Sequence, residues 1–216
     1  MLFRSKGNAD RMLSREETMV SPYLEDEMSK ITPVVNTNGS DSAMLDNTLE
    51  FFVMNGMPLP LAVMITIPEP WSNNKAMEQE KKDFYQYYAT MMEPWDGPAS
   101  ILFSDGDIMG AVLDRNGLRP SRYYITNDGY LILSSEVGAL PIDESRIKVK
   151  DRLHPGKMLL VDTVKGELID DDKLKEQYAT KQPYGEWLDN NLINLCDLKI
   201  PKKKVPTRSE ERRVGK

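Results

Sequence analysis

Helical spacing dominates the hydrophobic pattern in the amino-terminal half of the chain. Apolar residues recur at the i, i+4, i+7 and i+8 positions of one helix face, namely Leu45, Leu49, Phe52 and Val53. Ser40 or Asp41 can cap this helix at its start, and Asn55-Gly56 follows its last apolar residue. These signals predict a helix that begins near Ser40 and ends near Asn55.

Three neighbouring segments have weaker or different patterns. Residues 8–30 predict two short helices separated near Ser21-Pro22. The run from Leu59 to Pro68 is apolar on all sides, so its pattern fits a buried helix and a buried strand equally well. The spacing over 75–92 predicts an amphipathic helix. Its apolar face is expected to lie in the core and contains Phe84, Tyr87, Tyr88 and Met91.

From residue 99 the chain changes to short β-rich runs joined by glycine-containing turns. Three pairs of runs predict three hairpins: 101–103 with 108–113, 123–125 with 130–133, and 158–161 with 167–169. Asp-Gly turns favour the positive φ angles of tight hairpins, so an antiparallel sheet is expected. Helical periodicity returns between Asp171 and Leu195. Helices, hairpins and helices in this order predict an α+β domain rather than a doubly wound nucleotide-binding fold.

Composition places the chain in the ordinary globular class. Its 216 residues, 40% of them hydrophobic and 29% charged, suit one domain, or one domain with a tail. No apolar run approaches the roughly 20 residues of a membrane span, and residues 1–11 do not read as a secretory signal, so we expect a cytoplasmic protein that does not cross a membrane. The single cysteine, Cys196, is expected to be a small buried hydrophobe, and the single histidine, His154, a surface turn residue.

Charge and motifs exclude several kinds of site. Residues 199–216 carry a net charge of +6, whereas the preceding 198 residues carry −12. An acidic body argues against a nucleic-acid surface. Neither G-x-G-x-x-G nor a P-loop occurs, and one His with one Cys leaves no Cys/His zinc site. The loop at 36–41 lacks the ligand order of a calcium site, so no metal is expected.

Two polar segments carry more information. Residues 36–42 deliver Asp41 to a helix start, where backbone N–H groups and a carboxylate can hold a zwitterion. The segment from Asp114 to Pro120 is an unusually charged link between two hairpins. Taken alone, the first segment is more simply a capping motif and the second a salt-bridged turn.

In combination, four segments carry a family resemblance. Residues 36–41, 67–71, 93–99 and 114–120, in this order and spacing, resemble the glutamine amidotransferase domain of the large subunit of glutamate synthase. The similarity runs from about Gly7 to about Thr207. It implies a four-layer αββα sandwich of antiparallel sheets, of the N-terminal-nucleophile hydrolase type, with its amino-terminal part missing.

The resemblance also implies a reaction. That family hydrolyses glutamine to glutamate and ammonia for the reductive amination of 2-oxoglutarate. No cofactor is expected in this segment, because FMN and an iron–sulfur cluster would belong to the other domains. Implied partners are glutamine, the remaining synthase domains, and an electron-donating small subunit or ferredoxin.

Site residues follow from the same resemblance. It assigns the α-amino group of glutamine to Asp41, with Gly39 and Ser40 beside it. It implies a structural role near the site for Asp114, Arg115, Asn116, Gly117 and Arg119. The family's nucleophile is a cysteine at the mature amino terminus, and its oxyanion donors come from a His-Asn-Gly-Glu-Ile-Asn-Thr stretch. Neither occurs in these 216 residues, so no catalytic residue is expected and the fragment is predicted to be inactive.

The expected organisation is a non-family leader over 1–6, a partial type 2 glutamine amidotransferase domain over 7–198, and a basic linker with a non-family tail over 199–216. The ends predict an incomplete reading frame flanked by foreign codons. Two alternatives stay open. One is another class II amidotransferase with a different acceptor, and the other is a non-catalytic module that binds glutamine or docks to a synthase partner.

Overall fold

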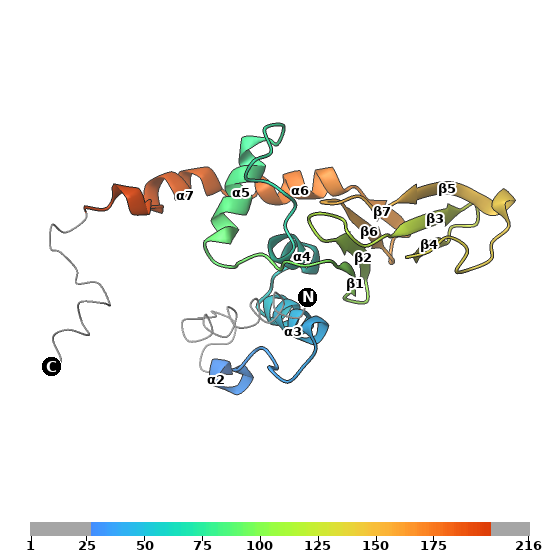
Figure 1. Cartoon of the computed structure of the whole chain (residues 1–216), viewed down its shortest axis with the longest axis horizontal. Helices are drawn as coiled ribbons and strands as arrows, with labels where there is room; N and C mark the ends of the chain where they lie inside the picture. The colour runs from blue at the N-terminus through green and yellow to red at the C-terminus, as the bar shows by residue number, and fades with distance from the viewer. Residues whose placement is uncertain (1–26, 200–216) are drawn as a thin grey trace, which may run out of the picture.

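Helices and two antiparallel sheets make up the computed structural model, which describes residues 27–199 (Figure 1). The expected leader over 1–6 and tail from 200 onward lie outside the described residues. So does most of the predicted helical region over 8–30, of which only α2 (Met28–Ile31) falls within them. Among the described residues, no helix is both long and apolar enough to cross a membrane.

Helix α3 (Asp41–Met54) confirms the clearest helical pattern of the sequence. It begins after Ser40, whose Oγ accepts the N–H of Ala43 at 3.3 Å, and this bond satisfies one of the free donors of the first turn. The predicted face is buried at Leu45 and Leu49, whereas Val53 is 38% exposed near the end of the helix. The helix therefore faces the core mainly through its first three turns.

The apolar run after α3 forms a helix rather than a strand. This helix, α4 (Leu59–Thr66), is buried at every position, which is why its sequence shows no polar face. Helix α5 (Gln79–Ala89) is shorter than the predicted 75–92. Its face at Phe84 is fully buried as expected, but Met91 lies beyond the helix end and is 47% exposed, so the predicted burial of Met91 is wrong.

All three predicted hairpins are present. The larger sheet has the order β1-β2-β6-β7 and the smaller one the order β4-β3-β5, with antiparallel pairing throughout. The larger sheet contains β1 (Ser100–Ser104), β2 (Ile108–Leu113), β6 (Met158–Asp162) and β7 (Glu167–Ile169). The smaller sheet contains β3 (Arg122–Thr126), β4 (Leu131–Ser134) and β5 (Ile147–Arg152). The predicted α+β class with antiparallel sheets is confirmed.

Strand β5 is absent from the sequence prediction. Four of its six residues are charged, and it lies at the edge of the smaller sheet. Charged side chains are typical of edge strands because they discourage pairing with further chains. The same charges hide the alternating pattern by which a strand is recognised in a sequence. A short 3-10 turn, η2 (Glu144–Arg146), leads into this strand.

Two helices replace the single helical region expected over 171–195. They are α6 (Asp171–Ala179) and α7 (Tyr184–Asn191), separated by residues 180–183. Beyond α7, the short turn η3 (Leu195–Asp197) leaves the body of the molecule. Cys196 in this turn is exposed, so its predicted burial is wrong. The apolar residues around it that suggested a core helix are themselves exposed, with Leu195 at 82%.

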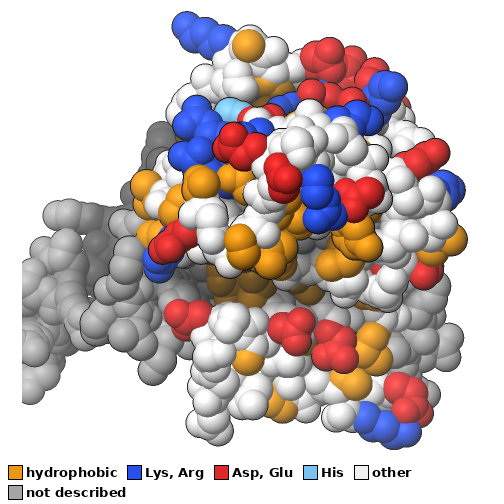
Figure 2. Space-filling model, turned by 90° about the vertical axis from the view of Figure 1, so that its right-hand side faces the viewer, with side chains coloured by type: hydrophobic (Ala, Val, Ile, Leu, Met, Phe, Trp, Pro, Cys, Tyr) orange, Lys and Arg blue, Asp and Glu red, His pale blue; other side chains and the backbone are white. Residues whose placement is uncertain are grey.

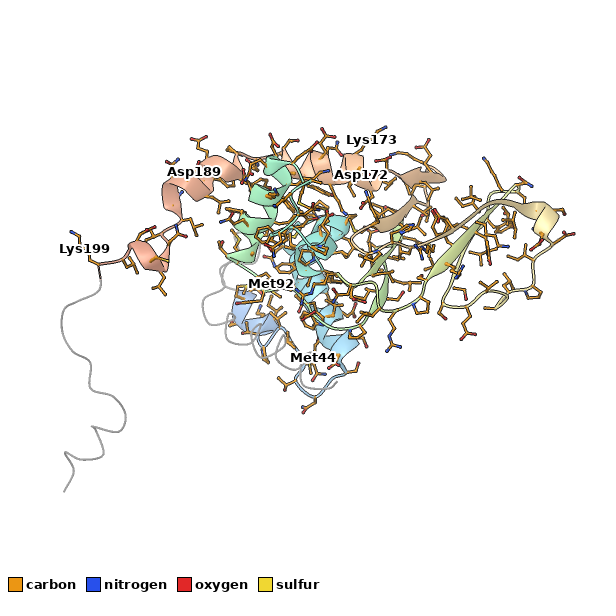
Figure 3. All side chains as sticks on the ribbon, turned by 45° about the horizontal axis from the view of Figure 1, so that its top comes forward. Met44, Met92, Asp172, Lys173, Asp189 and Lys199 are labelled. Atoms are coloured by element: carbon orange, nitrogen blue, oxygen red, sulfur yellow. The ribbon has the colours of Figure 1, made fainter. Side chains whose placement is uncertain are left out.

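The main core lies between the helices and the larger sheet. Its buried members include Val63 of α4, Phe84 of α5 and Leu160 of β6. Helix α5 packs against α6 and α7, where the rings of Phe84 and Tyr184 meet edge to face with centroids 5.5 Å apart. A smaller cluster joins α3 to the segment after α5 through Met44 and Met92, both labelled in Figure 3.

Candidate functional site

A cleft of about 1130 Å³ opens between the start of α3 and the two sheets. Its walls come from four separate parts of the chain: Asp41, Ser42 and Leu45; residues 95–101; Asn116 with residues 118–120; and Ser135 with Glu136. Figure 2 shows this face of the molecule hollowed, with hydrophobic side chains inside the hollow and acidic side chains beside it. The cleft thus brings together the two polar segments that the sequence singled out.

Asp41 is the first residue of α3, so its carboxylate lies at the positive end of the helix dipole. The loop before it is held by its own polar groups. Gly39 donates its N–H to the carbonyl oxygen of Asn36 at 2.9 Å, and Asn36 donates its N–H to Oδ1 of Asn47 at 3.1 Å. These bonds place Asp41 at the mouth of the cleft.

The two neighbours of Asp41 in the prediction lie differently. Ser40 lines an adjoining groove between α3 and β1, and its Oγ lies 3.0 Å from Oγ of Ser42. Gly39 is not among the lining residues of the cleft or of that groove. A Cβ added at Gly39 would lie 3.1 Å from the carbonyl oxygen of Asn36, so the tight turn favours glycine. Asp41 therefore lines the cleft itself, whereas Ser40 lines the adjoining groove and Gly39 lies in the turn behind Asp41.

Asp114 binds the backbone of the second polar segment through its side chain. Its side chain is buried, and its carboxylate accepts three backbone N–H groups. The donors are Ala99 at 3.0 Å and Leu118 at 3.2 Å to Oδ1, and Asn116 at 3.1 Å to Oδ2. Because Ala99, Asn116 and Leu118 all line the cleft, one buried carboxylate holds together two walls of the site.

Arg115 and Gly117 fix the same segment from outside. Arg115 Nη2 lies 3.1 Å from Oδ2 of Asp96, which joins it to residues 95–101 across the rim of the cleft. Gly117 has a φ of +61°, and a Cβ there would lie 2.3 Å from Cγ of Pro155. Asn116 and Arg119 face the cleft on either side of this glycine. Of the five residues predicted to surround the site in this segment, two line the cleft and three support it.

The chemistry of the cleft suits a small zwitterion. Its lining residues include the acidic Asp41, Asp96 and Glu136, the basic Arg119, and the apolar Leu45 and Ile101. Opposite charges on separate walls can bind the ammonium and carboxylate groups of an amino acid. No His, Cys or Lys is among the described residues that line the cleft, so it offers no thiol and no neutral base.

Sequence reasoning missed part of this lining. Ser135 and Glu136 follow β4 in a segment without a motif, and only the tertiary fold brings them beside Asn116. Trp95 and Asp96 lie in the segment at 93–99, one of the four that carry the family resemblance. The resemblance could therefore have pointed to these two residues. His154 is half exposed in a turn where Lys157 donates its N–H to the His154 carbonyl oxygen at 3.1 Å, as predicted.

No group of three or more His, Cys, Asp or Glu side chains that could hold a metal ion occurs among residues 27–199. The charged side chains gather instead in a buried cluster behind the cleft, around Lys175 of α6. Its Nζ lies 3.2 Å from Oε1 of Glu69 and 3.0 Å from Oδ2 of Asp171. Tyr85 donates its hydroxyl to the same Glu69 oxygen at 2.9 Å. This cluster was also absent from the sequence prediction, because its members lie far apart in the chain.

Alkaline pH is expected to destabilise the protein through Tyr85. Burial raises the pKa of this hydroxyl well above its usual value of 10.0, and the charge of Glu69 raises the pKa further. The unfolded chain therefore loses this proton at a lower pH than the folded chain, and the free energy of unfolding falls as pH rises above about 10. Urea unfolding between about pH 8 and about pH 11 should show a shallower decline for Tyr85→Phe than for the wild type. The exposed Tyr130→Phe is the matched control, and an unchanged decline in Tyr85→Phe would contradict this expectation.

Comparison with known proteins adds a family to this geometry. The family described as class-II glutamine amidotransferases matches residues 4–187. The chain is 48% identical over 190 residues to the glutamate synthase [NADPH] large chain of Bacillus subtilis, and 48% identical over 194 residues to glutamate synthase [NADH] of Saccharomyces cerevisiae. It is 44% identical over 193 residues to ferredoxin-dependent glutamate synthase 2, chloroplastic, of Arabidopsis thaliana.

These alignments cover most of this chain and little of the relatives. They include 88% of the chain and 12% of the Bacillus subtilis and Arabidopsis thaliana proteins, and 89% of the chain and 9% of the yeast protein. The chain thus spans about a tenth of the length of these relatives.

Proposed function

The chain belongs to the class-II glutamine amidotransferases, and on this premise we propose that it forms the glutamine-binding part of the amidotransferase domain of a glutamate synthase. In such an enzyme the domain hydrolyses glutamine to glutamate and ammonia, and the ammonia serves the reductive amination of 2-oxoglutarate. Another class II amidotransferase is the less favoured alternative, because the relatives reported above are glutamate synthases.

One observation carries the proposal: Asp41, at the positive end of α3, lines the same cleft as Arg119. An ionised carboxylate there binds the α-ammonium group of glutamine by a charge-assisted hydrogen bond. The guanidinium of Arg119, which belongs to a different wall, can add a favourable field for the α-carboxylate. Ser100 and Ser135 also line the cleft, and their hydroxyl groups can serve the side-chain amide.

The chemical step needs a group that the lining does not offer. Hydrolysis in this family uses a thiolate that attacks the amide carbonyl, so that the C–N bond breaks and ammonia leaves, after which water releases glutamate. Cys196 is the single cysteine of the 216 residues, is exposed, and is not among the lining residues. We therefore expect this polypeptide by itself to bind glutamine without releasing ammonia.

An iron–sulfur cluster, one of the electron carriers of a glutamate synthase, does not fit this chain. An iron–sulfur cluster needs several cysteine ligands, and the sequence has one cysteine. The proposal accordingly assigns FMN, the cluster, and the electron-donating small subunit or ferredoxin to other parts of the enzyme, and it derives no step of this domain through them.

Calorimetric titration with L-glutamine tests the proposed role of Asp41. The variant Asp41→Asn should bind glutamine about 10- to 100-fold more weakly than the wild type, because a charge-assisted hydrogen bond contributes about 1.5–3 kcal/mol. Asp46→Asn is the matched control, since Asp46 is an exposed aspartate on the same helix that lines the adjoining groove instead of the cleft. Equal affinities of the Asp41 and Asp46 variants would contradict the assignment.

A substrate analogue sharpens the same test. An analogue of glutamine that lacks the α-amino group should bind the wild type and Asp41→Asn with the same affinity, because it cannot use the carboxylate. An ammonia assay on the same samples separates the two kinds of function. Binding without ammonia release supports a glutamine-binding part, whereas turnover by the 216-residue polypeptide would show a complete catalytic site.

A further inference from the structure

Lys175 is a buried cation whose ammonium group is surrounded by three oxygen atoms. Its side chain is 4% exposed, and its Nζ lies 3.0 Å from Oδ2 of Asp171 and 3.2 Å from Oε1 of Glu69. It also donates to the carbonyl oxygen of Gly156. An ammonium group has three donors and no acceptor, so these oxygen atoms are favourable neighbours for it. Lys175 therefore ties α6 to the turn at residues 154–156 and to the segment before α5.

The turn at 154–156 lies closely against Glu69. Gly156 has a φ of +73°, and a Cβ added there would lie 2.9 Å from Cβ of Glu69. Glu69 is held in turn by the hydroxyl of Tyr85. Asp171 is held by the N–H of Met158, which it accepts at 3.1 Å. Both carboxylates that face Lys175 thus also accept a neutral donor, and Oδ2 of Asp171 lies 3.5 Å from Nζ of Lys157 as well. The ammonium group of Lys175 completes this cluster under the turn.

The other side of this turn touches the cleft wall. Pro155 is stacked on Gly117, where a Cβ would lie 2.3 Å from Cγ of the proline. Gly117 lies between Asn116 and Leu118, two lining residues of the cleft whose N–H groups are bound by Asp114. A continuous series of contacts therefore leads from Lys175 through Gly156 and Pro155 to the cleft.

We propose that Lys175 is a positioning residue of the glutamine site, which acts by holding the turn at 154–156 against Gly117 and so fixing the cleft wall at residues 116–118. The inference rests on the proposed function, because it assigns the wall a role in glutamine binding. Lys175 itself is not a lining residue of the cleft. It affects the ligand indirectly, through its contact with Gly156 and through the contact of Pro155 with Gly117.

Native-state hydrogen exchange on the 216-residue chain tests the positioning role directly. In Lys175→Met, the amides of Asn116 and Leu118 should exchange about tenfold faster relative to the amides of β6, because local opening of the wall becomes easier by about one hydrogen bond. The affinity for L-glutamine should fall by a similar factor. Lys173→Met is the matched control, since Lys173 is exposed on the same helix and is labelled in Figure 3.

A second variant tests the next contact in the series, between Pro155 and Gly117. Pro155→Ala removes the ring atoms that cover Gly117 and leaves the ion cluster intact. It should speed exchange at Asn116 and Leu118 in the same way, and the double variant should weaken glutamine binding no more than Lys175→Met alone. If Lys175→Met is unfolded, Lys175→Gln replaces it in the same measurements, because its shorter amide cannot reach all three oxygen atoms that surround the ammonium group.

Two results would overturn the proposal. The first concerns Lys175→Met. If the exchange rates at Asn116 and Leu118 rise by the same factor as those of the β6 amides, the substitution acts only on global stability. The other is unchanged exchange at these two amides in Pro155→Ala. If the wild type binds no glutamine, the proposed function fails, while the exchange rates still decide whether Lys175 positions the wall.

Discussion

Replacing Asp114 by alanine is expected to lower the free energy of unfolding by about 3–5 kcal/mol, because three backbone N–H groups lose one buried acceptor together. One donor is Ala99, directly before β1, and the other two are Asn116 and Leu118 in the segment at 114–120. Asp114 is 4% exposed, so water has little access to the position of the lost acceptor. The cleft walls should separate in this variant, and glutamine binding should be lost with stability.

Urea unfolding followed by tryptophan fluorescence measures this effect. Asp105→Ala is the matched control, because the Asp105 carboxylate also accepts two backbone N–H groups, from Asp107 and Ile108, but in an exposed turn. Water can replace the lost acceptor there, so we expect a change of about 1 kcal/mol or less. Similar losses in the two variants would show that the burial of Asp114 has no special importance.

Truncation of Phe84 to alanine should lower the free energy of unfolding by about 3–5 kcal/mol through the cavity it leaves. The ring is fully buried and lies within 5.5 Å, centroid to centroid, of the rings of Tyr85, Tyr88 and Tyr184. These contacts join α5 to α7, so the variant should loosen the packing of α7 as well.

Met91→Ala is the control for Phe84→Ala. The two residues share one predicted helix face, but Met91 is 47% exposed. We therefore expect about 0.5 kcal/mol or less from Met91→Ala in the same urea titration. If Met91→Ala lowered the free energy of unfolding by several kcal/mol, the buried apolar face would extend past the end of α5, as the sequence pattern alone predicts.

Local chemistry made the hairpins predictable. The turns at Gly106, Gly129 and Gly166 all have positive φ angles, of 101°, 86° and 69°, and glycine adopts such angles without steric cost. The cap of α3 at Ser40 is equally local, since the donor lies three residues further along the chain. These elements are determined within a few residues, so their signals survive in the sequence.

Features that depend on distant contacts were not predictable in this way. Strand β5 pairs with β3 across more than twenty residues, and its charges mask the strand pattern. Helix α4 could not be told from a strand, because complete burial removes the polar face that would show a period. The exposure of Cys196 reflects a segment that lies outside the core, which an apolar sequence does not reveal.

The candidate site was predictable only in part for the same reason. Motifs identified Asp41 and the segment at 114–120, but the closure of one cleft by Glu136 follows from the tertiary fold. The cluster around Lys175 joins residues more than a hundred positions apart in the sequence, and single motifs do not show such contacts. The domain boundaries at 7 and 198 and the cytoplasmic location stay predictions.

The central claim is that glutamine occupies the cleft between Asp41 and the 114–120 segment. The most direct measurement is a heteronuclear NMR titration of the 216-residue chain with L-glutamine, followed at the backbone amides. The account predicts the largest saturable shifts at Ser40 to Ser42 and at Asn116 and Leu118, with small shifts in β5 and α7. Saturable shifts centred elsewhere, or no shifts at saturating glutamine, would contradict it.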